Sequence, residues 1–209
     1  MLRRRHITLI RRLVTKIVDP EAARLRTIYD EPPVSLAAQY PDVPEPDDPM
    51  SPMVIAARWG SRDLYGEDMP GVAADLLEKG YDTPSLRRLA GEMNVACSAD
   101  VEPLVARVFR ELGVRYPLTE LERSLIASRQ IAREVIAGKR NAWTSATHLE
   151  IRIWGWIPKT TELETIFRIN DELSWDFAHR RRLSELEAVL LDAFAALAII
   201  EIPTRATSS

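Results

Sequence analysis

The residues best suited to metal or acid–base chemistry lie in the C-terminal third of the chain. Asp176 and His179 are three positions apart, which on a helix places a carboxylate and an imidazole on one face. A helical di-iron site needs two such carboxylate-x-x-His pairs and two further carboxylates. His148 has Ser145 three positions before it, so the second pair is missing. We therefore expect no metal, and an ion pair between Asp176 and His179; an enzymatic site around Glu172, Asp176 and His179 is kept as an alternative.

Cys97 is the single cysteine, which excludes an intramolecular disulfide and suits a reducing cytoplasm. As a nucleophile it would need a histidine nearby, and the chain has three: His6, His148 and His179. Its setting, Val-Ala-Cys-Ser-Ala, favours a buried, unreactive thiol. The sequence also has no phosphate-binding loop, no Gly-x-Gly-x-x-Gly and no Gly-x-Ser-x-Gly. We expect no catalytic residue and no cofactor.

Four of the five tryptophans fall within 33 residues, and two of them, in Trp154-Gly-Trp156-Ile-Pro158, occupy a segment between two expected helices. If exposed, this segment would offer the aromatic anchors that protein interfaces favour. If buried, which is the commoner state of tryptophan, it would fill the space between helix pairs. The run His179-Arg-Arg-Arg182 fits either an acidic partner or a solvated turn. The candidate protein-binding residues are Trp154, Trp156, Arg180, Arg181 and Arg182.

Residues 1–30 form a basic arm with eight Lys/Arg against three Asp/Glu, a net charge of +5. Apolar residues recur at steps of three and four, which predicts an amphipathic helix; they are Ile7, Ile10, Val14 and Ile17. Three interpretations compete: contact with an anionic membrane surface, contact with nucleic acid phosphates, or packing on the body. The candidate contact residues for the first two are Arg3, Arg4, Arg5, Arg11 and Arg12. A native start at Met50 or Met53 is a further interpretation.

Residues 31–52 contain seven of the fourteen prolines and five acidic residues with no basic one. Proline removes a backbone donor and disfavours helix in the residue before it. We expect an extended, solvated linker that acts as a spacer, with recognition by a proline-binding module as the less favoured alternative.

The elements that position these residues are helices. Apolar residues at helical spacing, separated by single glycines and prolines, predict a globular domain over residues 53–203, followed by a polar tail, 204–209. Capping residues predict helix starts at Thr83, Asp100, Thr119 and Thr161, and single glycines predict helix ends at Gly80, Gly113 and Gly138. Residues 147–153 fit a strand or a helix, and we favour a helix because an isolated strand would lack a partner. The fold predicted is an all-α bundle of about seven or eight helices, preceded by the tethered amphipathic helix.

Length and composition agree with this organisation. The 209 residues are 46% hydrophobic and 28% charged, typical of a globular protein, and the net charge is -3. No apolar run is long enough to cross a membrane, so we expect a cytoplasmic protein without a transmembrane segment.

The segment Leu77-Glu-Lys-Gly-Tyr-Asp-Thr-Pro-Ser-Leu-Arg-Arg-Leu-Ala-Gly91 resembles one found in an uncharacterised family of bacterial all-helical proteins. Ala132-Arg-Glu-Val-Ile-Ala-Gly138 and Leu163-Glu-Thr-Ile-Phe167 are similar to other parts of those proteins, so the resemblance covers roughly residues 53–200. It implies a fold, and a likeness to small immunity or accessory proteins, with no assigned activity.

Together these observations predict a non-catalytic, cytoplasmic protein of immunity or accessory type that binds another protein. The first alternative is a nucleic-acid or anionic-membrane accessory protein that uses the basic arm. The second alternative is an enzyme with a helical site near Glu172, Asp176 and His179.

Overall fold

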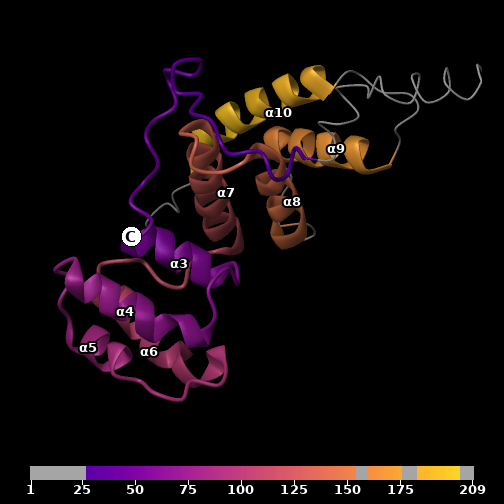
Figure 1. Ribbon diagram of the computed structural model, residues 1–209. Helices are drawn as coiled ribbons and strands as arrows, with labels where there is room; N and C mark the ends of the chain where they lie inside the picture. The colour runs from indigo at the N-terminus through magenta and orange to yellow at the C-terminus, as the bar shows by residue number, and fades with distance from the viewer. Residues whose placement is uncertain (1–26, 154–159, 176–182, 203–209) are drawn as a thin grey trace, which may run out of the picture.

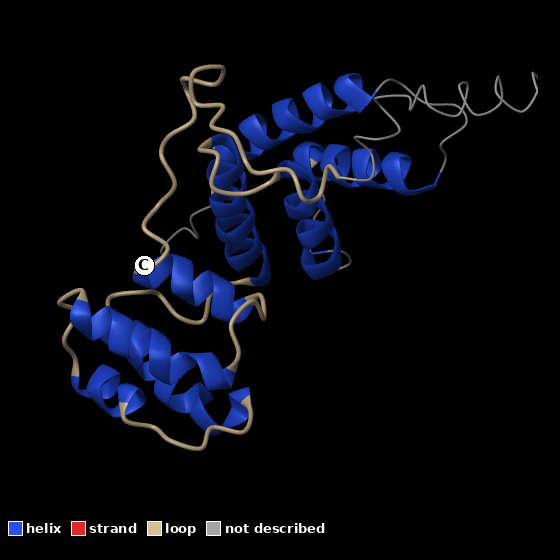
Figure 2. Ribbon diagram, viewed as in Figure 1, coloured by secondary structure: helices blue, strands red, loops and turns tan. Residues whose placement is uncertain are grey.

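The computed structural model describes residues 27–153, 160–175 and 183–202. Within these ranges the chain forms eight α-helices and one 3-10 helix, without strands, so the all-α prediction is confirmed (Figures 1 and 2). The expected amphipathic helix in residues 1–30 lies almost wholly outside the described residues. The elements are α3 (Pro52–Gly60), η1 (Gly66–Asp68), α4 (Met69–Glu78), α5 (Pro84–Ala90), α6 (Ser98–Glu111), α7 (Glu120–Ile136), α8 (Ala142–Ile153), α9 (Thr161–Trp175) and α10 (Leu183–Ala198).

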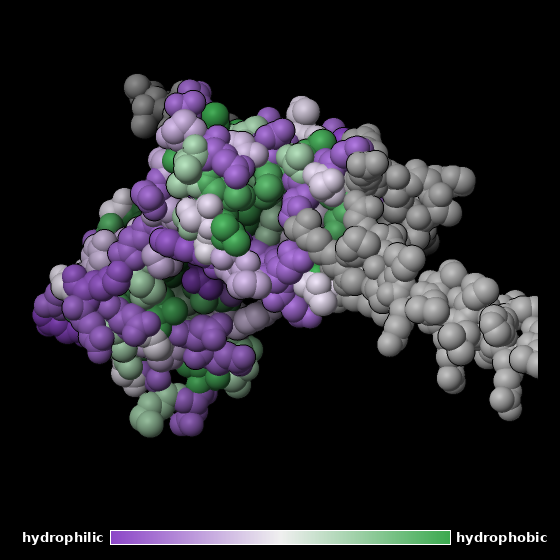
Figure 3. Space-filling model, turned by 45° about the horizontal axis from the view of Figure 1, so that its top comes forward, coloured by the Kyte–Doolittle hydropathy of each residue, from purple (hydrophilic) through white to green (hydrophobic). Residues whose placement is uncertain are grey.

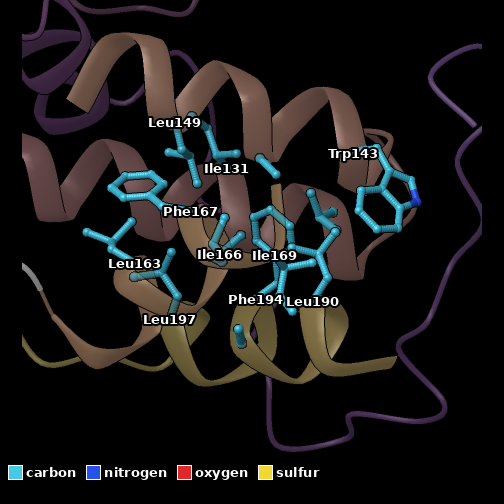
Figure 4. Close-up of a cluster of buried hydrophobic side chains, with 14 of the residues drawn as sticks. Ile131, Trp143, Leu149, Leu163, Ile166, Phe167, Ile169, Leu190, Phe194 and Leu197 are labelled. Atoms are coloured by element: carbon cyan, nitrogen blue, oxygen red, sulfur yellow. The ribbon is translucent and has the colours of Figure 1, made fainter. Parts of the chain in front are cut away.

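The helices form two lobes, each with its own hydrophobic core. The N-terminal lobe consists of α3 to α6, and its core includes Ile55, Met69, Leu86 and Phe109, all at most 1% exposed. The C-terminal lobe consists of α7 to α10 together with Ile28, and its interior is shown in Figure 4. Helix α3 packs against α7 and joins the two lobes, which lie one below the other in Figure 1.

Three helices of this fold end in the same way, at a glycine in the left-handed region. Gly80, Gly113 and Gly138 have φ values of 89°, 78° and 72° and follow α4, α6 and α7. At each glycine, its amide and the next one donate back to carbonyls of the last helical turn, the pattern of a Schellman motif. These are the positions at which the sequence predicted helix ends.

Helix starts agree with the predictions in most cases. Thr83 and Thr119 each accept a hydrogen bond from a backbone N–H of the first turn, as their positions before α5 and α7 predict. Asp100 is not the N-cap of α6, as expected, but its third residue; its carboxylate accepts from the N–H groups of Ala96 and Cys97. The hydroxyl of Thr160, one residue earlier than expected, accepts from Leu163 N at the start of α9.

Residues 31–51, which we call the strap, run along the outside of the C-terminal lobe in extended and turn conformations. The absence of helix was predicted, but the expected solvated spacer was wrong, because the strap makes specific contacts. Leu36, Tyr40 and Val43 pack against the C-terminal core, and Leu36 N donates to Ile136 O (2.8 Å). Proline removes the backbone donor at six of the 21 strap positions, and the strap is attached by side chains as well as by its backbone.

Polar contacts fix the strap to both lobes. The Tyr40 hydroxyl donates to Asp192 Oδ1 on α10 (2.8 Å), and Arg133 Nη1 of α7 donates to Asp47 Oδ1 (3.0 Å). Lys79, which follows α4 in the N-terminal lobe, lies 2.6 Å from Asp48 Oδ2. The strap therefore connects the lobes a second time, besides the α3–α7 contact.

Helix α8 (Ala142–Ile153) includes residues 147–153, so the helical interpretation of that segment is confirmed. The Asn141 side chain accepts from Trp143 N and Thr144 N and thereby caps this helix. Among the described residues, no helix has the length and apolar character needed to cross a membrane.

Candidate functional site

Most of the residues predicted to act lie outside the described residues. This holds for Arg3, Arg4, Arg5, Arg11 and Arg12 of the arm, for Trp154 and Trp156, and for Asp176, His179, Arg180, Arg181 and Arg182. Glu172 is described: it is half-buried on α9, with Arg168 Nη1 3.8 Å from its carboxylate. This pairing with Arg168 was not expected.

The described helices show that the two predicted protein-binding segments attach far from each other. The segment with Trp154 and Trp156 joins the end of α8 to the start of α9, and the segment with Arg180–Arg182 joins the end of α9 to the start of α10. Helix α9 has 15 residues, so its ends are about 22 Å apart. The two segments are thus attached at opposite ends of one helix, and we treat them as separate candidates.

The exposed fractions of the side chains show which tryptophans lie in the interior and where an apolar side chain reaches solvent. Trp143 is 2% exposed and Trp59 8% exposed, so both belong to the interior. Ile151, in the last turn of α8, is 73% exposed. Its position in the sequence alone would have allowed its side chain to face the core. A large apolar side chain therefore reaches solvent where the chain leads into the Trp154–Trp156 segment.

A cleft of about 590 Å³, open to solvent, lies between the lobes. We call it the interlobe cleft. It is lined by residues of α3, α7 and α8 and of the loops near them, namely Pro49, Val54, Arg58, Ser61, Asp63, Ala127, Gln130, Ile131, Glu134, Arg140 and His148.

The charged groups of the interlobe cleft are engaged with one another. Arg58 Nε donates to Asp63 Oδ2 (2.8 Å), and His148 Nε2 lies 3.6 Å from Asp63 Oδ1. On the other wall Glu134 accepts from both Gln130 and Arg140. Each described charge on these walls thus has an opposite charge beside it. This arrangement is more typical of polar contacts that hold the two lobes together than of an acid–base site.

Ser61, Asp63 and His148 are the residue types of a hydrolytic triad and line the same cleft. A triad needs the serine hydroxyl hydrogen-bonded to the imidazole. Ser61 Oγ is buried and has no hydrogen-bond partner among the described residues, so His148 does not contact it as a base. The geometry therefore gives no activated serine. Within the described part of the chain, no group of three or more His, Cys, Asp or Glu side chains could hold a metal ion.

Several groups in or beside the strap have shifted pKa values, and the shift at Tyr40 is large. Burial, together with the hydrogen bond to Asp192, raises the pKa of Tyr40 to about 12. The Lys79 ammonium lowers the pKa of the Asp48 carboxyl, and burial, with Arg133 nearby, lowers the pKa of Arg129. These shifts come from groups that attach the strap, so they mark structural contacts.

Cys97 is exposed, which overturns the expectation of a buried thiol. Its small neighbours suggested an interior position, but it immediately precedes α6, and the lobe buries the residues on the inner face of that helix instead, such as Val101 and Val105. An exposed thiol without a described basic partner is accessible, yet nothing beside it acts as an activating group.

Sequence reasoning missed a second pocket, open to solvent, beside the strap. Its walls come from the strap, the end of α7, the start of α8 and α10, and they include Val34, Leu36, Arg140, Trp143, Glu187 and Leu191. The available signals were the apolar residues placed among the prolines of the strap and the helix-capping Asn141. We call this pocket the strap groove.

On the face shown in Figure 3 the surface is mainly hydrophilic, with apolar side chains gathered in one area of its upper half. Comparisons with protein-family models, with curated proteins and with solved structures give no match to this chain. Its function is therefore argued from its own residues.

Proposed function

We propose that this chain is a non-catalytic, cytoplasmic protein of immunity or accessory type that binds another protein. The proposed contact surface is the C-terminal end of α8 with the segment that follows it, namely Ile151, Trp154 and Trp156. The observation that supports it is the 73% exposure of Ile151, which lies three residues before Trp154 and five before Trp156.

Helix α8 already buries one face, so Ile151 is not needed for its packing. Trp143, Ala146 and Leu149 are at most 2% exposed and face the core of the C-terminal lobe. Ile151 lies outside that row. A partner that covered such a side chain would gain about 1.5–3 kcal/mol from its burial.

Tryptophans near an exposed aliphatic residue match the composition of interface hot spots. Such sites are few, are enriched in Trp, Tyr and Arg, and lie near the centre of the contact. Arg180, Arg181 and Arg182, attached at the far end of α9, would form a separate contact at the rim. There an arginine mainly affects the rate of association and its dependence on salt.

The test is affinity purification of the full chain and of two exposed-residue variants. Ile151→Glu places a charge in the proposed contact, while Met93→Glu makes the same kind of change at a side chain that is 82% exposed in the N-terminal lobe. Proteins retained by the wild type and Met93→Glu, but lost from Ile151→Glu, are the candidates to purify and measure by calorimetry.

With a purified partner, we expect Ile151→Glu to weaken binding at least about tenfold, which corresponds to about 1.4 kcal/mol, and Met93→Glu to leave it unchanged. Trp154→Ala and Trp156→Ala should weaken it as well. Urea unfolding of each variant checks stability, which should stay that of the wild type for Ile151→Glu because the side chain is exposed. A partner bound equally by wild type and Ile151→Glu would refute the proposal.

A further inference from the structure

The strap groove contains a buried hydrogen-bond donor without an acceptor. Trp143 is 2% exposed, and its Nε1 has no hydrogen-bond partner among the described residues. In Figure 4 the indole nitrogen points away from the other labelled side chains of the core, toward the side on which the strap runs. Leaving such a donor unsatisfied costs about 1–3 kcal/mol. The nitrogen itself is closed to solvent, so an acceptor could reach it only if the atoms that cover it moved.

Helix α10, which forms one wall of the groove, is apolar on its outer side as well as on its inner side. Its inner face is buried through Leu186, Leu190, Phe194 and Leu197. Its other side carries apolar residues that are exposed or half-buried, which we call the outer row, namely Ala188, Leu191 and Ala195, and Ile199 follows directly after the helix. Leu191 and Ala195 also touch the C-terminal core, so the surface open to a ligand is the exposed part of these side chains together with Ala188 and Ile199. Such a surface, with a pocket beside it, fits the apolar face of another helix.

The surroundings of this row are acidic. Helices α9 and α10 together carry seven Asp or Glu residues and one basic residue, Arg168. Glu185 and Asp192, which border the outer row of α10, are exposed. An apolar row flanked by carboxylates is complementary to a helix that has an apolar stripe flanked by basic residues.

The chain itself contains a segment with that pattern, and it is attached at the groove. Residues 1–26 hold eight Lys/Arg and two Asp/Glu, a net charge of +6, and the sequence gives them an apolar stripe. Two residues later the Ile28 side chain is fully buried, and its carbonyl accepts from Asn141 Nδ2 (2.7 Å), a residue that lines the groove. Residue 28 is therefore held beside the groove, and a segment joined to it two residues earlier in the chain would meet the groove at an effective concentration of roughly the millimolar order.

We propose that the strap groove and the outer face of α10 are the docking site of the chain's own residues 1–26. The apolar stripe of that segment packs on the exposed parts of Leu191, Ala195 and Ile199, and its arginines face the carboxylates of α9 and α10. This contact is independent of the proposed partner surface at the end of α8. Docking also withholds the basic side chains from nucleic acids and anionic membranes.

The test is a spin-label measurement on the full chain, read from the amide signals of residues 1–26 by NMR. One label is attached to Ala196→Cys, an exposed position on α10, in a Cys97→Ser background. The control label is attached to the natural Cys97, which is exposed and belongs to the N-terminal lobe. We expect residues 1–26 to lose signal intensity with the label on α10 and to keep it with the label on Cys97.

Two charge variants test the source of the attraction. Glu185→Lys reverses a charge beside the outer row of α10, and Asp75→Lys makes the same change at an exposed position of the N-terminal lobe. Intensity should return in residues 1–26 with Glu185→Lys, and with about 1 M salt, where the Debye length is about 3 Å. It should stay low with Asp75→Lys.

A mixed sample distinguishes docking within one chain from docking between two copies. In it, one set of chains carries the spin label but no isotope, and the other set carries the isotope but no spin label. Loss of intensity in that mixture as well, as strong as the number of labelled chains allows, would overturn the proposal in favour of a second copy. Full intensity with the α10 label in every sample would overturn it altogether. Either result leaves the proposed function standing, because the partner test uses Ile151 and the segment after α8.

Discussion

Substituting Gly138 by alanine tests whether the strap is held as tightly as its contacts indicate. Gly138 ends α7 at φ 72°, and a Cβ added there would lie 2.3 Å from Ser35 N and 2.6 Å from Ser35 Cα. The atoms it meets belong to the strap backbone, so no rotamer change can relieve the overlap. The strap must move away from α7 in the Gly138→Ala variant.

The expected loss of stability has two parts. The left-handed conformation costs a residue with a Cβ about 1–2 kcal/mol, and the stiffer unfolded chain offsets about 0.4–1 kcal/mol of it. Displacing the strap also breaks the hydrogen bond from Leu36 N to Ile136 O, a loss of about 0.5–1.5 kcal/mol. It exposes part of the Leu36 side chain as well, a loss of about 1 kcal/mol. We expect Gly138→Ala to cost about 2–3 kcal/mol in total.

The chain offers two matched controls for the cost of the left-handed conformation. Gly80 and Gly113 end α4 and α6 with the same hydrogen-bond pattern and positive φ, but an added Cβ would meet no atom within 4 Å at either position. Gly80→Ala and Gly113→Ala should therefore cost about 1 kcal/mol each, the conformational part alone.

Urea unfolding of the three variants measures the difference, provided that the unfolding is two-state and the m-value is unchanged. Hydrogen exchange of the Leu36 amide should be faster in Gly138→Ala and unchanged in the two controls. If Gly138→Ala lost no more stability than Gly113→Ala and the Leu36 amide kept its protection, the strap would not be packed against α7 as described.

Three further predictions concern single residues. Because the pKa of Tyr40 is raised to about 12, its neutral form stabilises the fold below pH 10, and this contribution is lost as the pH rises from 10 to 12; Tyr40→Phe should remove that pH dependence, and an unchanged stability profile would contradict it. Glu122→Ala removes a carboxylate that accepts from Thr119 N (2.7 Å) and Arg115, and should cost about 1–2 kcal/mol, whereas the exposed Glu120→Ala should cost little; equal midpoints in urea would show that the capping box is not stabilising. Because Cys97 is exposed, iodoacetamide should alkylate it in the folded protein about as fast as in urea, and strong protection in the folded state would argue against the exposure.

Helix boundaries could be predicted because local chemistry sets them. Thr83 and Thr119 supply an acceptor to the first turn, and Gly80, Gly113 and Gly138 tolerate the left-handed conformation at which a helix ends. Both effects act within a few residues of sequence. The same reasoning fails at Asp100, since a carboxylate at the third helical position also satisfies the N–H groups before the helix.

The division into two lobes could not be predicted, because helical periodicity shows which face is apolar and not what covers it. Leu86 and Leu149 have the same pattern and are both fully buried, yet they belong to different cores. The strap was misjudged for a similar reason. Its prolines and charges indicated a spacer, while Leu36, Tyr40 and Val43 make contacts with residues distant in sequence that no local pattern reveals.

The candidate site shows the same limit. Trp154 and Trp156 stood out by type and spacing, and the structure adds to them only the exposure of Ile151 beside their segment. Neither the types nor the spacing of the residues in the sequence indicated the strap groove. It lies where the strap passes α10, and one of its lining residues is Trp143, whose buried indole N–H has no hydrogen-bond partner among the described residues.

The position of the strap in the chain has a consequence for the order in which the protein assembles during synthesis. Residues 31–51 leave the ribosome before any helix they contact, and the Tyr40–Asp192 bond joins residues 152 positions apart. The N-terminal lobe, whose helices follow one another directly, can close as soon as α6 has emerged, because folding proceeds unit by unit as the chain grows. The strap can meet Lys79 and the end of α7 earlier, but its bond to Asp192 must wait until α10 is complete, so a segment made before all of these helices completes its contacts last.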